Sequence, residues 1–250
     1  MNLFASEWIK ARSVRSTWLI AASTVVVTAL VSLLGISGLT AQWQAELPAD
    51  FDPVGVSFKG MLVGQLLIAM LGAQAVTSEY ASGQIISTLA IAPRRARLFA
   101  AKALVTVCVS AVVAVATVAA SFAAGQAALA VAGLPTASAA DADTVRAIVC
   151  AMVYLMLSAV LGLAFGTLTR SSSGALAIVV SVALLVPALA PGLPGIVGQF
   201  AGTFWPTTAG QASYTVGGSG VPPLLGLAVM AVFTVWMTAA AVTALRVRDV

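Results

Sequence analysis

The chain has 250 residues, 60% of them hydrophobic, and a mean hydropathy of +1.05. A soluble domain of this length cannot bury so much apolar surface, so the composition excludes an ordinary soluble enzyme and predicts an integral membrane protein. The net charge of +4 comes from 12 basic and 8 acidic residues that are not clustered like a nucleic-acid surface, which argues against a nucleic-acid partner.

The first 17 residues, MNLFASEWIKARSVRST, combine apolar and basic side chains. Leu3, Phe4, Trp8 and Ile9 can share one helix face, with the basic residues turned toward lipid headgroups. This pattern is typical of a short interfacial helix over 1–17. The same residues also fit a simple positively charged stop before the first membrane span, and the sequence leaves both interpretations open.

A membrane-spanning helix needs about 20 apolar residues in succession. Six segments meet or approach this requirement, and the fifth is the weakest because it is short and contains Pro187. We therefore predict an all-α integral membrane protein with a single transmembrane domain over residues 1–250. The six predicted spans cover about residues 18–39, 60–78, 103–124, 147–169, 174–190 and 224–245.

The basic residues divide unequally between the two sides of these spans. Ten of the 12 lie before the first span, in the connection 79–102, after the fourth span or after the sixth, whereas the opposite connections hold only Lys59 and Arg146. Cytoplasmic connections carry the excess of lysine and arginine in membrane proteins. Both termini and the connection 79–102 are therefore predicted to be cytoplasmic.

Two pairs of glycines have the four-residue spacing that lets transmembrane helices approach closely. They are Gly60 with Gly64 in the second span, and Gly162 with Gly166 in the fourth. We expect helix packing at these positions, and a contact between two copies of the chain is one form that it can take.

The connection between the fifth and sixth spans, residues 191–222, carries no charge, and neither does the whole interval from Ser171 to Leu245. An exposed loop of this length normally carries charge. The segment GIVGQFAGTFW is apolar enough to re-enter the membrane as short helices, provided that protein covers its backbone groups. Trp205 and Tyr214 are expected at the level of the headgroups.

Several kinds of chemistry lack the residues that they need. The predicted spans contain no Asp, Glu, Lys, Arg or His, and Cys108 and Cys150 lie in apolar runs that suit packing. A phosphate-binding loop needs lysine directly after glycine, and Lys10, Lys59 and Lys102 do not follow one. We therefore predict no catalytic, cofactor-binding or metal-binding residue, and energy for uphill transport has to come from another polypeptide.

The connection 79–102 holds much of the scarce charge of the chain. Gly83 lets the helix that leaves the membrane bend, and Pro93 ends the helical segment that follows. Between them Ile85, Ile86 and Leu89 form one apolar ridge, which suits insertion into a groove on a partner protein. The polar residues of the connection are Glu79, Arg94, Arg95, Arg97 and Lys102.

Simpler roles exist for each of these polar residues. The arginines can fix the topology and contact anionic lipid, at about 1 kcal/mol per basic residue. Glu79 can cap a helix or pair with a nearby arginine, and Lys102 marks the return of the chain to the membrane. These roles leave the order of glutamate, glycine, apolar ridge, proline and arginines unexplained.

The segment TSEYASGQIISTLAIAPRRARLFAAK resembles the signature of permease subunits of ATP-binding-cassette transporters of the type-2 exporter class. Gln84 departs from the family, which commonly has threonine after the glycine. The six spans, the interfacial start and the apolar outer connection extend the resemblance over nearly the full chain. The residues in matching places are Glu79, Gly83, Leu89, Pro93, Arg94, Arg95 and Lys102.

This resemblance implies a function, a set of partners and a location. The connection 79–102 would be a coupling helix that docks on a cytoplasmic ATPase, and two ATPase copies carrying ATP and Mg would serve two permease copies, identical or closely related. The chain itself would be a non-enzymatic export subunit in the cytoplasmic membrane of a bacterium. The alternatives are a secondary transporter or channel that works without ATP, and a membrane anchor or immunity protein that recruits a soluble partner.

Overall fold

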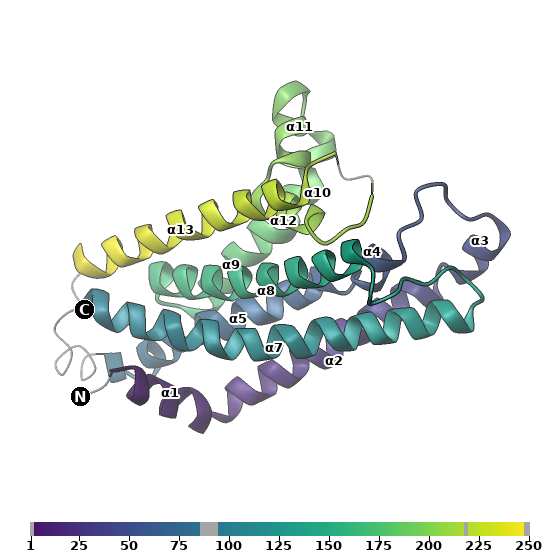
Figure 1. Cartoon of the computed structure of the whole chain (residues 1–250). Helices are drawn as coiled ribbons and strands as arrows, with labels where there is room; N and C mark the ends of the chain where they lie inside the picture. The colour runs from purple at the N-terminus through teal and green to yellow at the C-terminus, as the bar shows by residue number, and fades with distance from the viewer. Residues whose placement is uncertain (1–2, 86–94, 218–219, 248–250) are drawn as a thin grey trace.

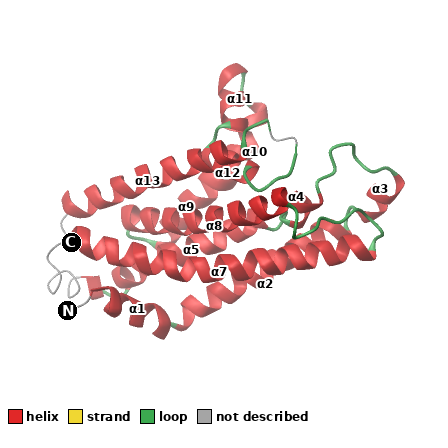
Figure 2. Cartoon of the chain, in the orientation of Figure 1, coloured by secondary structure: helices red, strands yellow, loops and turns green. Residues whose placement is uncertain are grey.

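The computed structural model describes residues 3–85, 95–217 and 220–247, and every regular element in these ranges is a helix (Figure 2). Six helical segments are long and apolar enough to cross a membrane, which confirms the all-α membrane fold. They are α2 (Arg15–Ser37), α5 (Met61–Ala81), α7 (Arg95–Val131), α8 (Ala142–Thr169), the interrupted segment Ser172–Gly192 and α13 (Pro223–Val247).

Shorter helices complete the bundle. One, α1 (Leu3–Ser13), precedes α2 at the end of the bundle where α13 finishes, and the other short helices lie in the connections between the long ones (Figure 1). These are α3 (Thr40–Ala45), α4 (Pro53–Ser57), α11 (Gly195–Thr203) and α12 (Pro206–Ala212). The interrupted segment consists of α9 (Ser172–Val180), the π-helical turn η1 (Ser181–Leu185), α10 (Val186–Leu189) and the 3₁₀ turn η2 (Ala190–Gly192).

Helix α7 is much longer than the predicted third span. Its 37 residues extend about 55 Å at 1.5 Å per residue, whereas the hydrocarbon core of a bilayer is about 30 Å thick. The prediction began this span after Lys102, but a basic side chain does not interrupt a helix, and neither proline nor glycine occurs between Arg95 and Ala124. Lys102 is therefore a residue within a helix, two turns from its start.

The interruption of the fifth span is explained by Pro187. In the π-helical turn the Val186 N–H donates to the Ser181 carbonyl, so the Val182 carbonyl would be paired next with residue 187, which as proline has no N–H. The indole N–H of Trp205 and the hydroxyl of Thr207 donate to the Val182 carbonyl instead, at 2.7 and 3.2 Å. The outer connection thus satisfies a backbone group that the span leaves open.

The outer connection contributes two helices with different surroundings. The ring of Tyr214, just after α12, packs against those of Tyr154 and Phe58 at 5.4 and 5.9 Å, so this tyrosine is buried in the protein rather than turned to headgroups as expected. Helix α11 stands away from the bundle (Figure 1), with Ile196 and Phe200 exposed. A re-entrant course for residues 191–222 stays a prediction.

A polar contact crosses the apolar core between α5, α8 and α12. The hydroxyl of Tyr154 donates to the side-chain oxygen of Gln65 and accepts a hydrogen bond from Gln211 Nε2 at 3.4 Å. Tyr154 is fully buried and is among the largest side chains of the core. Because the Tyr154 hydroxyl both donates and accepts a hydrogen bond, its burial leaves no hydrogen-bonding group without a partner.

The glycines singled out by their spacing lie where two helices of the same chain touch. A Cβ atom on Gly162 would lie 1.8 Å from the Ala69 carbonyl oxygen, and one on Gly72 would lie 1.8 Å from the Ala159 carbonyl oxygen. This reciprocal contact brings the backbones of α5 and α8 together. Clashes of the same kind would occur at Gly60, Gly64 and Gly166.

These contacts show which helices pack at the two glycine pairs. Gly60, Gly64, Gly162 and Gly166 are buried within one chain, and their neighbours belong to α2 and α5. The predicted helix packing is therefore present within the chain. The contact between two copies that we considered for the same glycines is not available to them, because the chain itself fills these surfaces.

We predict that Gly162→Ala lowers the unfolding temperature of the detergent-solubilised protein. The added methyl group must push α5 and α8 apart, and overpacking of this kind costs about 1–3 kcal/mol, or several degrees. Gly202→Ala on α11 is the matched control, because nothing lies within 4 Å of the added atom. Equal unfolding temperatures for the two variants would contradict the close contact.

Candidate functional site

The connection 79–102 joins two helix ends at the end of the bundle where α1 starts and α13 finishes (Figure 1). Helix α5 ends at Ala81, and Gly83 follows with a φ of +71°. Glycine adopts this left-handed conformation without steric cost, so the predicted bend occurs at the predicted residue. Helix α7 then begins at Arg95 and leads back along the bundle.

A charge cluster of Glu7, Lys10, Glu79 and Lys102 joins α1, α5 and α7 beside this connection. The ammonium group of Lys102 donates to Glu7 Oε2 and Glu79 Oε1, both at 2.7 Å, and to the Ala75 carbonyl at 3.1 Å. The ammonium group of Lys10 donates to Glu7 Oε1 at 2.9 Å and to Glu79 Oε1 at 2.8 Å. One residue from α7 and one from α1 thus share the same two carboxylates.

The charge cluster is deeply buried and electrically balanced. Lys102, Glu79 and Glu7 are 3%, 4% and 7% exposed, and the two lysines match the two glutamates in formal charge. Buried charges are tolerated only when they are paired and hydrogen-bonded, and removing one partner leaves the other uncompensated. The pairing therefore ties α1 to the membrane helices more firmly than surface ion pairs would.

Lys10 lies at the solvent side of the charge cluster, with its side chain 40% exposed. Partial burial would lower its pKa, but the hydrogen bonds and charges of Glu79 and Glu7 outweigh that effect and raise the pKa above the ordinary lysine value. Lys10 therefore keeps its positive charge at neutral pH.

Glu79 pairs with two lysines and with no arginine among the described residues, so the pairing expected with an arginine is wrong. Lys102 is buried and paired, and its place at the return of the chain to the membrane stays a prediction. Sequence reasoning missed Glu7 completely. The feature of the sequence that could have indicated a role for Glu7 is that it is the only acidic residue before Glu46, in a segment whose other charged residues are basic.

The apolar ridge of the connection is described only at Ile85. That side chain is 4% exposed and faces Val76, Leu98, Phe99 and Leu245, so the expectation of an exposed ridge is wrong at this position. The surrounding residues come from α5, α7 and α13. Ile86, Leu89, Pro93 and Arg94 lie outside the described residues, so their docking role stays a prediction.

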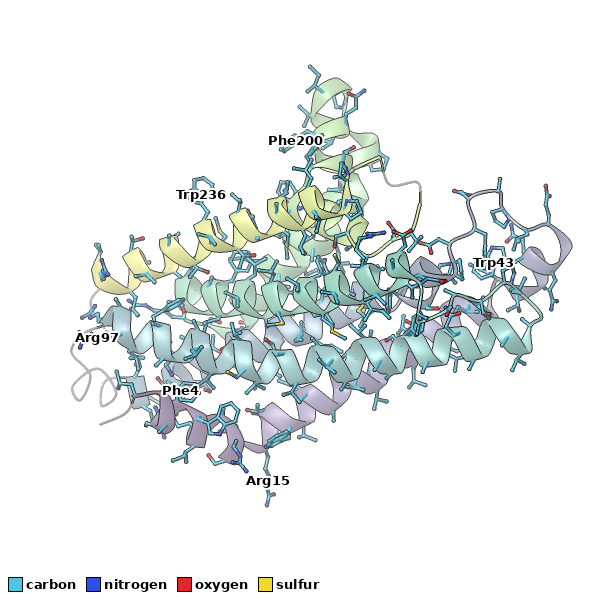
Figure 3. The ribbon with its side chains drawn as sticks, in the orientation of Figure 1. Phe4, Arg15, Trp43, Arg97, Phe200 and Trp236 are labelled. Atoms are coloured by element: carbon cyan, nitrogen blue, oxygen red, sulfur yellow. The ribbon has the colours of Figure 1, made fainter. Side chains whose placement is uncertain are left out.

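The two described arginines of the connection point to different surroundings. Arg95 Nη1 donates to the Leu245 carbonyl at 2.8 Å, near the end of α13, where carbonyl groups lack partners within the helix and the helix dipole favours a cation. Arg97 is exposed and lies at the start of α7 (Figure 3). Arg95 thus joins α7 to α13, and Arg97 is available to a partner.

The N-terminal segment is helical over Leu3–Ser13, which is shorter than the predicted 1–17 because α2 already begins at Arg15. The rings of Phe4 and Trp8 stack at 6.0 Å, Ile9 is 66% exposed, and Arg15 points away from the bundle (Figure 3). These features fit a helix on the membrane surface, although that position stays a prediction. The charge cluster holds this helix against α5 and α7.

A comparison with known protein families found a match for this chain. The family model described as ABC-2 family transporter protein matches residues 3–188, which include α1, the connection 79–102, the first four candidate spans and most of the fifth. A search of curated proteins found no match. The family match covers most of the chain and all four residues of the charge cluster.

We predict that Lys102→Met destabilises the protein by about 3–5 kcal/mol, the usual cost of removing one partner from a buried ion pair. Combining it with Glu79→Gln should recover part of this loss, because the double variant removes a charge of each sign. Thermal unfolding in detergent measures both effects.

The matched control is Asp143→Asn on α8. It removes the ion pair of Asp143 with Arg146, which has a distance of 3.4 Å and a 74% exposed carboxylate, so the expected loss is below about 1 kcal/mol. If Lys102→Met and Asp143→Asn had the same small effect, the charge cluster would not hold α1 in place.

Proposed function

The chain belongs to the ABC-2 transporter family, and from this premise we propose that it is the permease subunit of an ATP-driven exporter. It is a multi-pass membrane protein, and its family implies association with an ABC ATPase. In the proposal, the connection 79–102 docks on that ATPase in the cytoplasm, and the chain binds no nucleotide itself. ATP and Mg are held by two ATPase subunits that serve two permease copies.

The observation that carries the proposal is the charge cluster on both sides of the connection. Glu79 on α5 is the first residue of the connection and Lys102 on α7 is its last, and they bind Lys10 and Glu7 of α1, respectively. A force on the connection would therefore reach three helices together. This is what a coupling element needs, because a flexible loop would absorb the movement of its partner.

The path from the connection into the bundle is also stiff. Helix α5 touches α8 through the reciprocal contacts of Gly72 and Gly162, and Ser172 at the start of α9 donates to the Thr77 hydroxyl at 2.7 Å. Arg95 reaches the end of α13. We propose that closure of the ATPase subunits tilts α5 and α7 with these neighbours, which opens the solute path to the outside.

The rival functions differ in where they need charge. A carrier driven by protons needs ionisable groups along its solute path, whereas the charge cluster lies at one end of the bundle and is internally balanced. A membrane anchor needs a partner but no movement of its helices. Transport in vesicles containing the chain, with and without its ATPase, separates all three functions.

We expect the end of the bundle with Arg97 to face the cytoplasm. In a variant with Cys108 and Cys150 changed to alanine, Arg97→Cys should react with a membrane-impermeant maleimide only after the cells are opened. Leu47→Cys at the opposite end, 43% exposed in the native chain, should react in intact cells. The reverse pattern would place the connection outside the cell and contradict the proposal.

We predict that Leu89→Asp abolishes co-purification of the ATPase and lowers the rate of ATP-dependent transport at least about tenfold. The reason is that a charge in the apolar ridge opposes its burial against a partner. Val131→Asp adds the same charge at a residue that is 92% exposed, at the far end of α7. This control variant should still co-purify with the ATPase and should keep the native transport rate. Normal ATPase capture by Leu89→Asp would remove the ridge from the docking surface.

A further inference from the structure

A cavity of about 340 Å³ lies beside the charge cluster, between α1, the start of α2, α5 and α7. Ligand pockets in proteins have volumes of about 300–1,000 Å³, so this space can hold a small molecule or part of a lipid. It lies at the end of the bundle where α1 meets the membrane helices (Figure 1). None of the functions considered so far uses it.

The cavity has a polar end and an apolar end. Glu79 and Lys102 form the polar end, together with Thr106 one turn further along α7. Leu71 lies eight residues before Glu79 on α5, which places it about 12 Å deeper in the bundle, and Val109 lies at a similar depth on α7. An occupant therefore needs a polar head and an apolar body.

Two buried acceptors at the polar end lack partners within the described part of the chain. Glu79 Oε1 accepts from both lysines, but Glu79 Oε2 accepts no hydrogen bond, and neither does Thr106 Oγ1. Their residues are 4% and 2% exposed. Lys102 cannot fill them, because its three N–H groups already have three acceptors. A buried carboxylate oxygen without a partner is costly, so this site calls for a hydrogen-bond donor.

The opposite wall of the cavity suits an anion. The first turn of α2 contributes Ser16 and Thr17 to the lining, at the positive end of the helix dipole, where the Thr17 N–H donates to the Val14 carbonyl at 3.2 Å. Lys10 uses two of its three N–H groups for Glu7 and Glu79. A phosphate group can therefore bind here while a donor reaches Glu79.

The balance of charge decides between possible occupants. The charge cluster is neutral as a whole, so an isolated cation or anion in the cavity would leave a buried charge without compensation. A zwitterion adds no net charge. A primary ammonium group brings three N–H donors to the polar end, where Glu79 Oε2 and Thr106 Oγ1 lack partners, and its phosphate would face α2 and Lys10.

We propose that this cavity binds the headgroup of a phospholipid that carries a primary ammonium group, with one acyl chain along Leu71 and Val109. The apolar end favours the lipid over its free headgroup, and the predicted position of α1 on the membrane surface would let the lipid enter from the bilayer. The site does not depend on the proposed coupling to an ATPase, since it is formed by this chain alone.

The test is a lipid titration of the delipidated full chain in detergent, followed by native mass spectrometry. Phosphatidylethanolamine should bind at one molecule per chain and about tenfold or more tightly than phosphatidylcholine, whose trimethylated nitrogen has no N–H to donate. Equal binding of the two lipids would overturn the proposal. The proposal would also be overturned if phosphatidylglycerol, which has no ammonium group, bound as tightly as phosphatidylethanolamine or more tightly. The same holds for free phosphoethanolamine, which has no acyl chain.

Variants test the position of the site. Thr106→Val should weaken binding of phosphatidylethanolamine about tenfold without loss of a hydrogen bond within the protein, because its hydroxyl has no partner there. Thr238→Val on α13 removes another hydroxyl that is buried without a partner, away from the cavity, and should leave binding unchanged. Equal effects of the two variants would place the lipid elsewhere.

A second variant fills the apolar end of the cavity. Val109→Phe should abolish binding of the acyl chain and leave the charge cluster intact, which an unchanged unfolding temperature in the absence of lipid would verify. If the folded variant bound phosphatidylethanolamine as the native chain does, the proposed site would be wrong. If Val109→Phe did not fold, the lipid series and Thr106→Val would still decide the question.

Discussion

The structure depends on how a buried lysine at one end of the helix bundle is neutralised. Lys102 is almost fully buried, and it is held there by Glu79 of α5, by Glu7 of α1 and by a backbone carbonyl. Without these partners a charged lysine would have to reach water, and α7 would have to slide or tilt to let it do so. The charge cluster therefore fixes three things together. It sets the position of α7 along the bundle, it holds α1 against the bundle, and it joins the two ends of the connection 79–102.

Charge at the end of the bundle and small residues in its middle act on the same helices. In the membrane, apolar side chains gain little by leaving lipid for protein, so close backbone contact at residues such as Gly72 and Gly162 holds α5 against α8. The charge cluster then holds α5 against α1 and α7. A displacement that begins at the connection can thus pass to the central helix α8 without bending α5, which lacks proline throughout its length. Stiff contacts of this kind suit a family of membrane proteins that work with a separate ATPase.

The sequence predicted the number and type of the spans well, because an apolar run of about 20 residues has few other stable environments. It did not predict how far the helices extend. The third span was predicted to begin after Lys102 because charge was taken as its boundary, and the helix that contains this span starts at Arg95 and buries that lysine. Pairing partners such as Glu7 and Lys102 are 95 residues apart, and periodicity carries no information about contacts at that distance. The burial of Ile85 and Tyr214 was missed for the same reason, since neither follows from the residues next to it.

The cavity and the proposed coupling element share one set of side chains, and this has a thermodynamic consequence. Glu79, Lys10 and Lys102 line the space, and the same residues join α1 to α5 and α7. If α1 shifts against these helices during a transport cycle, the geometry around Glu79 Oε2 shifts with it, and the affinity for an occupant changes. Linkage makes this effect reciprocal, so an occupant that prefers one arrangement also favours that arrangement of the helices. A lipid at this position would bias the movement of the coupling element by as much as its affinity differs between the two arrangements, whatever solute the permease carries.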